Sequence, residues 1–359
     1  MALLRAPDGG ASAMVDTTSA LPSAPVLHTR SLDPAGLRAV VVNAGNANAA
    51  TGSPGLEDAG AMGAHAAGLL GLEAGRVAVS STGTVGERLD LDRVRRGIAE
   101  AANALRPDGG ADFAQAICTT DRAPKAGAFR LALPSGGEVT IGAAAKGAGM
   151  ISPRMATMLA YVTTDADVAP PDVARATASA AEASFNRISV DGQMSPSDTL
   201  IVLAGGGREP LEGDDRDAFA AGLAAVCRWL AIQMVKDGEG AEHVMRVVVR
   251  EAADDREAEV VARAVGNSPL VKTAAFGRDP NWGRVSQAVG QALAGRGGVA
   301  ADLRVAFDGV PGGAPAVAAV LARPEYDLEV SLGRGTAEAA LWASDLSHAY
   351  VTLNAEYHT

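Results

Sequence analysis

Short apolar segments alternate with amphipathic helical patterns along this chain of 359 residues, and they restrict its fold to the mixed α and β classes. Residues 1–36 have no clean hydrophobic period, so we expect loop and one weak strand there. A hairpin is expected over 127–142, and no linker, repeat or low-complexity tract divides the chain. Further strands are expected at 40–42, 76–80, 155–162, 187–190, 199–204 and 244–249, helices at 57–71, 91–105, 171–185, 216–234, 255–264 and 283–293, and alternating short strands and helices beyond residue 300.

The composition indicates a large core and an acidic surface. Apolar residues make up 48% of the chain but aromatic residues only 4%, so Ala, Val and Leu must fill the core. The net charge of −11 excludes a general nucleic-acid binder, which needs a basic face, and argues against an anionic membrane surface. No run approaches 18 apolar residues, so no membrane span is expected. The two cysteines, Cys118 and Cys227, cannot build a disulfide framework, which fits a reducing, cytoplasmic location.

Lysine is rare in this chain. Of the 31 basic residues only four are lysines: Lys125, Lys146, Lys236 and Lys272. Lysine carries a compact, titratable ammonium, whereas arginine is planar and permanently charged. A chain that uses arginine almost everywhere is expected to keep lysine where arginine cannot replace it, with coincidence as the alternative.

Several familiar kinds of site are absent from the sequence. No two histidines stand at metal-ligand spacing and there is no cysteine cluster, so we expect no metal ion. Neither a Gly-x-Ser-x-Gly elbow nor a Walker A motif occurs, so no serine-hydrolase site and no bound nucleotide cofactor is indicated.

The first glycine-rich loop, Ser81-Thr82-Gly83-Thr84-Val85-Gly86, directly follows the strand expected at 76–80. Such a loop can direct successive backbone N–H groups at a phosphate or an oxyanion. On its own the pattern also fits a plain turn between a strand and a helix.

The second glycine-rich segment begins at Lys146 and leads to Thr157, at the start of an apolar strand. A threonine there is ordinarily just a β-branched strand residue. The alternative is chemical: in a strained Ala156–Thr157 bond, the Thr157 hydroxyl can attack the preceding carbonyl and let water complete the cut. The α-amine of the new N-terminal threonine, with an ordinary pKa of about 7.7–8.0, can then act as the base for its hydroxyl. This chemistry needs no histidine.

The segment from Lys146 to Leu159 resembles the self-cleavage segment of the ornithine acetyltransferase family, the glutamate N-acetyltransferases of the cyclic arginine pathway. The resemblance extends from about residue 40 to the last residue. Further segments resemble the family in the right order: Asn43–Gly52, Ser81–Gly86, Cys118–Asp121, Phe185–Gly192, Asp237–Gly240, Asn267–Ala274, Gly277–Arg284 and Asn354–Thr359.

The resemblance implies a fold and a set of roles. The fold is a layered α/β/β/α sandwich in which an α fragment, 1–156, and a β fragment, 157–359, make one intertwined core and assemble as α2β2. The cut falls between Ala156 and Thr157, and Thr157 is the nucleophile. The oxyanion hole is formed by Thr82 and Gly83. The amino-acid substrate is bound by Thr119, Lys146, Thr157, Glu239, Asn354 and Thr359.

The implied reaction moves an acetyl group from N-acetylornithine to glutamate through an acetyl ester on Thr157. The family contains monofunctional and bifunctional members, so acetyl-CoA is left open as a second donor. Two rival functions also stay open: a self-cleaving N-terminal-threonine aminopeptidase or amidase of the same fold, and a paralogue that only binds an amino acid.

The sequence departs from the family pattern in a few short places. Residues 14–19 match it only loosely, and the start is about thirty residues shorter than is usual in the family. Cys118 replaces a methionine, and the segment 193–196 replaces a threonine-rich stretch. We expect these changes to bear on substrate range and stability more than on the reaction itself.

Overall fold

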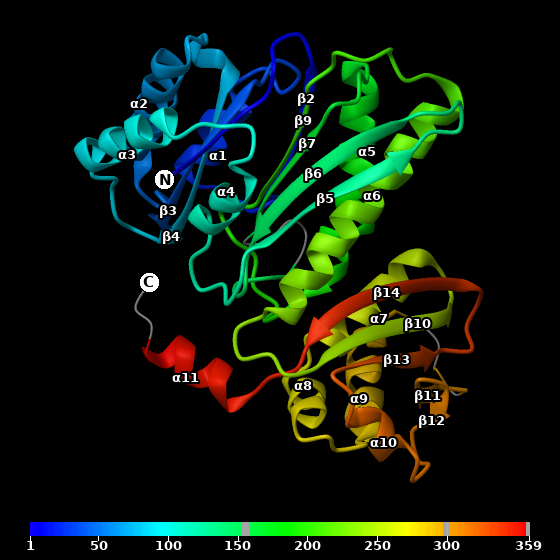
Figure 1. The fold of residues 1–359 in the computed structure, drawn as a ribbon. Helices are drawn as coiled ribbons and strands as arrows, with labels where there is room; N and C mark the ends of the chain where they lie inside the picture. The colour runs from blue at the N-terminus through cyan, green and yellow to red at the C-terminus, as the bar shows by residue number, and fades with distance from the viewer. Residues whose placement is uncertain (153–157, 297–299, 301, 357–359) are drawn as a thin grey trace. The chain divides into compact units, whose positions relative to one another are not determined.

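The computed structural model describes residues 1–152, 158–296, 300 and 302–356. Its contacts divide the chain into two compact units. The first comprises residues 1–186 and 193–234, and the second comprises 187–192 and 235–358. Figure 1 shows the elements of each unit.

A three-stranded sheet in the order β1-β3-β4 begins the first unit. The central strand, β3, pairs antiparallel with β1 and parallel with β4. The run Val40-Val41-Val42 lies in β3 and is fully buried, because both faces of this sheet are covered. The strands are β1 (Ala2–Arg5), β3 (Ala39–Asn46) and β4 (Val77–Thr84), and the nearby helices are α1 (Ala24–Arg30), α2 (Gly52–Leu70) and α3 (Leu91–Asn103).

A five-stranded sheet in the order β2-β9-β7-β6-β5 completes the strands of the first unit. Strand β7 is central: it pairs antiparallel with β6 and parallel with β9. In this register Leu159 lies opposite Lys146 on one side and Thr199 on the other. The strands are β2 (Ala11–Asp16), β5 (Lys125–Ala132), β6 (Glu138–Lys146), β7 (Leu159–Thr164) and β9 (Thr199–Ala204).

The alternation of side chains along the strands stacks the two sheets between helices. Val41 and Val79 share a core with helices α2 and α3, whereas Val40 and Val42 share a core with Tyr161 and other residues of the five-stranded sheet. Helices α5 (Pro170–Ala183) and α6 (Gly213–Lys236) lie along the other side of that sheet (Figure 1). The first unit is therefore layered as helices, sheet, sheet and helices, and the predicted α/β/β/α arrangement is confirmed.

Helix α6 is the one described helix that is long and apolar enough to cross a membrane by length and composition. Its apolar side chains are explained by packing within the first unit. The Trp229 ring meets the Phe129 ring of β5 edge-on at 5.2 Å, and Gly222 sits against the Leu131 side chain. Phe219 and Leu230 are almost completely buried. A core helix of this kind meets the same length and hydropathy criteria as a membrane span.

The second unit is a six-stranded sheet in the order β12-β11-β13-β10-β14-β8, with helices packed against it. Its core joins Val247 and Val249 of β10 to apolar residues of α7 and α9. The strands are β8 (Ile188–Ser189), β10 (Val244–Ala252), β11 (Arg304–Phe307), β12 (Val310–Pro311), β13 (Glu325–Ser331) and β14 (Ala337–Ser344), and the helices are α7 (Asp255–Gly266), α8 (Pro269–Phe276), α9 (Trp282–Leu293), α10 (Val317–Leu321) and α11 (His348–Glu356).

The expectation of loop and one weak strand in residues 1–36 is only partly right. This stretch holds two strands and a helix, β1, β2 and α1. All six residues of β2 pair antiparallel with β9, from Ala11 opposite Ala204 to Asp16 opposite Thr199. Pairing with a strand almost two hundred residues away stabilises a segment whose own sequence lacks a strand pattern.

Candidate active site

Three of the predicted site residues meet around one buried ammonium group. Lys146, the last residue of β6, is 3% exposed. Its Nζ donates to Thr119 Oγ1 at 2.7 Å and to Thr82 Oγ1 at 3.1 Å. Each hydroxyl accepts from the ammonium, so its own hydrogen is left to donate to another oxygen. The cluster therefore offers positive charge and two directed O–H donors at one point of the first unit.

Asp121 binds the residues that flank this cluster. Its side chain is fully buried, and its Oδ1 accepts from Lys125 Nζ at 2.5 Å and from the Gly147 N–H at 2.8 Å. Its Oδ2 accepts from the Thr119 N–H at 3.0 Å. Burial disfavours the charged carboxylate, but Lys146 and Lys125 outweigh it and hold the Asp121 pKa below its ordinary value. Asp121 thus fixes the residues next to Lys146 and the backbone of Thr119.

The predicted oxyanion loop is the end of strand β4. Thr82 is 2% exposed, and Gly83 has a φ of +129°, which favours glycine. A Cβ at Gly83 would lie 2.2 Å from the carbonyl carbon of Gly45, so the neighbouring strand leaves no room for a side chain. Position 83 therefore requires glycine, because the backbone of strand β3 lies too close for a side chain.

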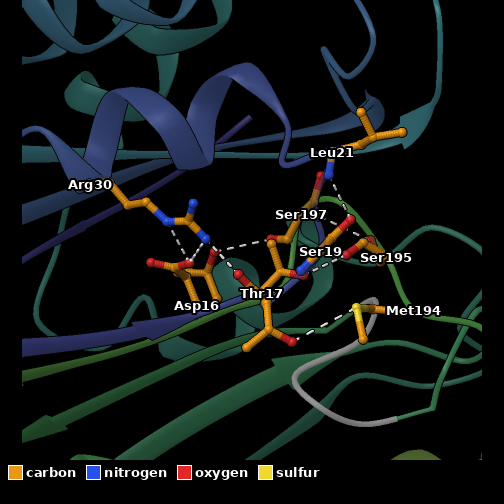
Figure 2. Close-up of polar contacts among 10 residues, drawn as sticks. Asp16, Thr17, Ser19, Leu21, Arg30, Met194, Ser195 and Ser197 are labelled. Atoms are coloured by element: carbon orange, nitrogen blue, oxygen red, sulfur yellow. Dashed lines mark hydrogen bonds and ion pairs between the residues drawn. The ribbon is translucent and has the colours of Figure 1, made fainter.

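Two segments of the first unit that depart from the family pattern contact each other (Figure 2). The Thr17 hydroxyl donates to the Ser195 carbonyl at 2.7 Å, and the Thr18 hydroxyl contacts the Met194 sulfur at 3.9 Å. The backbones are joined as well: the Thr17 N–H donates to the Asp198 carbonyl at 3.0 Å. Residues 17–18 and 194–198 therefore form one local structure next to the start of β7.

Two further predicted site residues meet in the second unit. Asn354 Nδ2, in α11, donates to Glu239 Oε2 at 2.9 Å. The turn that carries Glu239 is attached to the start of this helix: a Cβ at Gly240, whose φ is +66°, would lie 2.4 Å from the Tyr350 nitrogen. The Ser347 hydroxyl also donates to the Gly240 carbonyl at 2.6 Å. Close packing of the turn at Gly240 against the start of α11 thus brings Glu239 and Asn354 together.

A buried charged cluster lies close by in the second unit. Lys272 is 3% exposed and donates to the carbonyl and the hydroxyl of Ser344. Asp345 Oδ2 and His243 Nδ1 are hydrogen-bonded at 3.0 Å within the same buried region. Burial lowers the Lys272 pKa to about 8, although the negative charges of Asp345 and Asp191 oppose that effect.

The remaining predicted site residues, Ala156, Thr157 and Thr359, lie outside the described residues. Sequence reasoning missed the roles of Asp121 and Lys125. Asp121 ends the segment Cys118–Asp121 that resembles the family, and Lys125 is one of only four lysines, so a signal for both was present. Among the described residues, no group of three or more His, Cys, Asp or Glu side chains is arranged to hold a metal ion.

Comparison with known proteins identifies the family of the chain. The ArgJ family model matches residues 1–359. The arginine biosynthesis bifunctional protein ArgJ of Symbiobacterium thermophilum is 46% identical over 97% of this chain and 90% of its own length, and that of Bacillus licheniformis is 40% identical over 97% and 88%. The crystal structure of the Bacillus halodurans protein of that name is 34% identical, with a TM-score of 0.51, over 55% of this chain and 98% of that chain.

The layered fold and the buried Lys–Thr–Thr cluster fit an enzyme of the class that the sequence motifs indicate. The chain belongs to the ArgJ family. Membership confirms the predicted family and the predicted acetyltransferase function in arginine biosynthesis that the resemblance implied. The roles of the individual site residues stay predictions.

The buried Asp121 carboxylate predicts a large stability effect. Asp121→Asn leaves the Lys125 ammonium buried without its counter-charge, so the free energy of unfolding should fall by about 3–5 kcal/mol. Urea denaturation measures this. The matched control is Asp172→Asn, which breaks a surface ion pair with Arg175, 63% exposed, and should cost less than about 1 kcal/mol. Equal, small losses for both variants would contradict the role given to Asp121.

The lowered pKa of Lys272 predicts a particular pH dependence of stability. Between pH 8 and 10.5 the unfolded chain binds more protons at this residue than the folded chain, so folding gains stability as the pH rises. Relative to Lys272→Met, the wild type should gain about 3 kcal/mol across this range. Chemical denaturation at several pH values measures the difference, and a difference that does not change with pH would contradict it.

Proposed function

We propose that the protein is a self-cleaving glutamate N-acetyltransferase that transfers the acetyl group of N-acetylornithine to glutamate. The Thr157 hydroxyl is the nucleophile, and its α-amine, released by cleavage after Ala156, is the base. Thr82 and Gly83 stabilise the oxyanion. The amino-acid substrates are held by Thr119, Lys146, Thr157, Glu239, Asn354 and Thr359.

The observation that carries this proposal is the placement of Lys146 between Thr82 and Thr119. Three residues that are separated by up to 64 positions along the chain share one buried hydrogen-bonded cluster. The register of the five-stranded sheet also sets Lys146 opposite Leu159, two residues after Thr157. The strand that follows the proposed cut therefore pairs with the strand that ends at Lys146.

The transfer proceeds in two half-reactions. The Thr157 oxygen bonds to the acetyl carbonyl carbon and gives its proton to the threonine α-amine. The oxyanion accepts hydrogen bonds from the Thr82 hydroxyl and the Gly83 N–H. The C–N bond to ornithine breaks, and the α-amine returns the proton to the departing nitrogen. The glutamate amine then bonds to the carbonyl carbon of the acetyl ester, the C–O bond to Thr157 breaks, and the α-amine carries a proton from the attacking nitrogen to the Thr157 oxygen. An amide is exchanged for an amide, so no nucleotide is consumed.

Charge supports the assignment of the substrate groups. An ammonium such as that of Lys146 suits a substrate carboxylate, and a carboxylate such as that of Glu239 suits a substrate amine. The two sets of residues lie in different compact units, each assembled by its own contacts.

Two observations support cleavage into fragments that stay together. Strands β2, β5 and β6 precede residue 156 and strands β7 and β9 follow it, yet all five belong to one sheet. The Bacillus halodurans chain is covered over 98% of its length by a match to only 55% of this chain, as expected of a protein that exists as two fragments. An α2β2 assembly in the cytoplasm, with no nucleic-acid or membrane partner, completes the proposal.

The rival reaction is hydrolysis, in which water rather than glutamate takes the acetyl group. Ornithine release from N-acetylornithine should depend on added glutamate, with N-acetylglutamate formed in equal amount. Release that is indifferent to glutamate would favour the aminopeptidase or amidase. A parallel assay with acetyl-CoA and glutamate tests the second donor, and a chain that catalyses neither reaction would be the amino-acid-binding paralogue.

The buried position of Lys146 predicts that arginine cannot replace it. The planar guanidinium of Lys146→Arg does not fit a site shaped around an ammonium with two hydroxyl partners, so kcat/KM should fall by about 10²-fold or more. Lys236→Arg is the matched control, because Lys236 is 36% exposed and pairs with Glu325 at 2.6 Å, which an arginine can also do. Wild-type kinetics in Lys146→Arg would remove Lys146 from the site.

The proposed cut predicts two fragments of 156 and 203 residues, the second beginning with Thr157. Thr157→Ala lacks the attacking oxygen and should remain one chain without transferase activity. Thr157→Ser keeps the hydroxyl and should cleave more slowly, because loss of the methyl group frees the rotamer. N-terminal sequencing and mass spectrometry measure this, with Thr163→Ala as a cleaving control. A wild-type chain that stays whole and still transfers acetyl groups would refute the mechanism.

A further inference from the structure

Met158, the first described residue after the proposed nucleophile, has both of its backbone groups bound by the segment that leads into β9. Its N–H donates to Asp198 Oδ1 at 2.7 Å. Its carbonyl accepts from the Thr199 N–H at 3.0 Å. The second of these bonds joins two backbone groups, whereas the first is accepted by a side chain.

Asp198 is a completely buried carboxyl group, with an exposed fraction of 0%. Its Oδ2 is buried as well, and the Thr17 hydroxyl and the Ser195 N–H lie beside the carboxyl. Complete burial of a carboxyl group costs free energy, so its presence calls for compensating contacts or a function. The transfer reaction proposed above gives this side chain no role.

The surroundings favour the neutral form of this group. Burial raises the Asp198 pKa well above its ordinary value, and this effect outweighs the Met158 N–H and the positive charge of Lys146, which both favour the carboxylate. The Thr17 hydroxyl and the Ser195 N–H lie next to the carboxyl and act in the same direction as Lys146. A neutral carboxyl still accepts a hydrogen bond from an amide.

The segment that carries Asp198 is itself held in place. The Thr17 N–H donates to the Asp198 carbonyl at 3.0 Å, and the Ser23 N–H donates to the Pro196 carbonyl at 2.8 Å. Figure 2 shows the neighbouring contacts of Thr17 with Ser195. These hydrogen bonds hold the backbone of Asp198, and with it the carboxyl group, in one position.

We propose that Asp198 is a positioning residue for the N-terminal nucleophile, holding the amide of Met158 so that the preceding Thr157 is oriented for both self-cleavage and acetyl transfer. This inference rests on the role proposed for Thr157. The peptide group that joins Thr157 to Met158 is planar, so fixing the Met158 N–H also fixes the plane of the Thr157 carbonyl. Orientation of a nucleophile contributes strongly to rate, and small displacements reduce it.

Three variants test the proposal. Asp198→Asn keeps an oxygen that accepts from the Met158 N–H, and it should cleave and turn over within about threefold of wild type, with an unchanged pH profile. Asp198→Ala removes the acceptor, and it should slow cleavage and lower kcat by about 10- to 100-fold, with KM little changed. Ser197→Ala is the matched control, because the neighbouring Ser197 hydroxyl is buried and makes no hydrogen bond to another described residue.

A direct measurement separates this inference from the function on which it rests. In the uncleaved Thr157→Ala background, amide hydrogen exchange reports whether Asp198 protects the Met158 N–H. Adding Asp198→Ala should speed this exchange at least tenfold, whereas adding Asp198→Asn should leave it slow.

The outcomes are distinct. Cleavage and kcat at wild-type values in a folded Asp198→Ala would overturn the inference, and so would an Asp198→Asn that is as slow as Asp198→Ala, because a proton or a charge would then be required. If Asp198→Ala fails to fold, Asp198→Val takes its place, because it fills more of the buried space but cannot accept from the Met158 N–H, and the same losses are expected. A wild-type chain that neither cleaves nor transfers would refute the role of Thr157, while the exchange of the Met158 amide would still report on Asp198.

Discussion

The pairing of strand β7 on both of its edges is the constraint on which the first unit depends. It lies between β6, which ends at Lys146, and β9, which begins at Thr199, directly after Asp198. Because β7 is hydrogen-bonded to both neighbours, a break in the chain before Thr157 would leave β7 in the sheet. The same pairing places Lys146, at the end of β6, and Thr199, at the start of β9, on either side of Leu159. Strand β7 therefore holds β6 and β9 in one sheet and also positions the residues of the candidate site that lie at their ends.

Much of this fold can be predicted from periodicity alone, and the failures have a physical cause. The uninterrupted apolar run of β9 and the glycine-rich hairpin between β5 and β6 are local signals, and both are found where expected. Strands β1 and β2 carry no such signal, because their stability comes from pairing with β3 and β9. Sequence patterns report what a segment prefers locally, whereas edge strands are decided by their partners.

The candidate site divides in a similar way. Motif resemblance was sufficient to select Thr82, Thr119 and Lys146, which the structure brings together. It did not assign a role to Asp121 or Asp198, because an aspartate in a loop is most often a turn residue. Only the folded chain shows that both are buried and accept backbone N–H groups. Groups that position other residues leave weaker traces in a sequence than groups that react.

The rarity of lysine gave information that motif matching did not. Lys125, Lys146 and Lys272 are all 3–4% exposed, and each has a defined oxygen partner, whereas Lys236 is a partly exposed ion pair. Burial of an ammonium is costly unless its few hydrogens meet acceptors at short range. A small tetrahedral group satisfies that condition in a narrow space, while a planar guanidinium with five N–H donors requires more acceptors.

Two of the segments expected to depart from the family pattern, 14–19 and 193–196, are in contact. Residues 17–18 and 194–195 contact each other, so a change in one segment alters the surroundings of the other. Both are joined to Asp198: the Thr17 N–H holds its carbonyl, and residues 194–195 precede it by only three or four positions. Residues 17–18 and 194–195 therefore lie around the backbone of Asp198. Its carboxyl contacts Met158, which belongs to neither of these segments. Sequence change in the supporting segments is compatible with a constant reaction as long as they keep the Asp198 backbone in place.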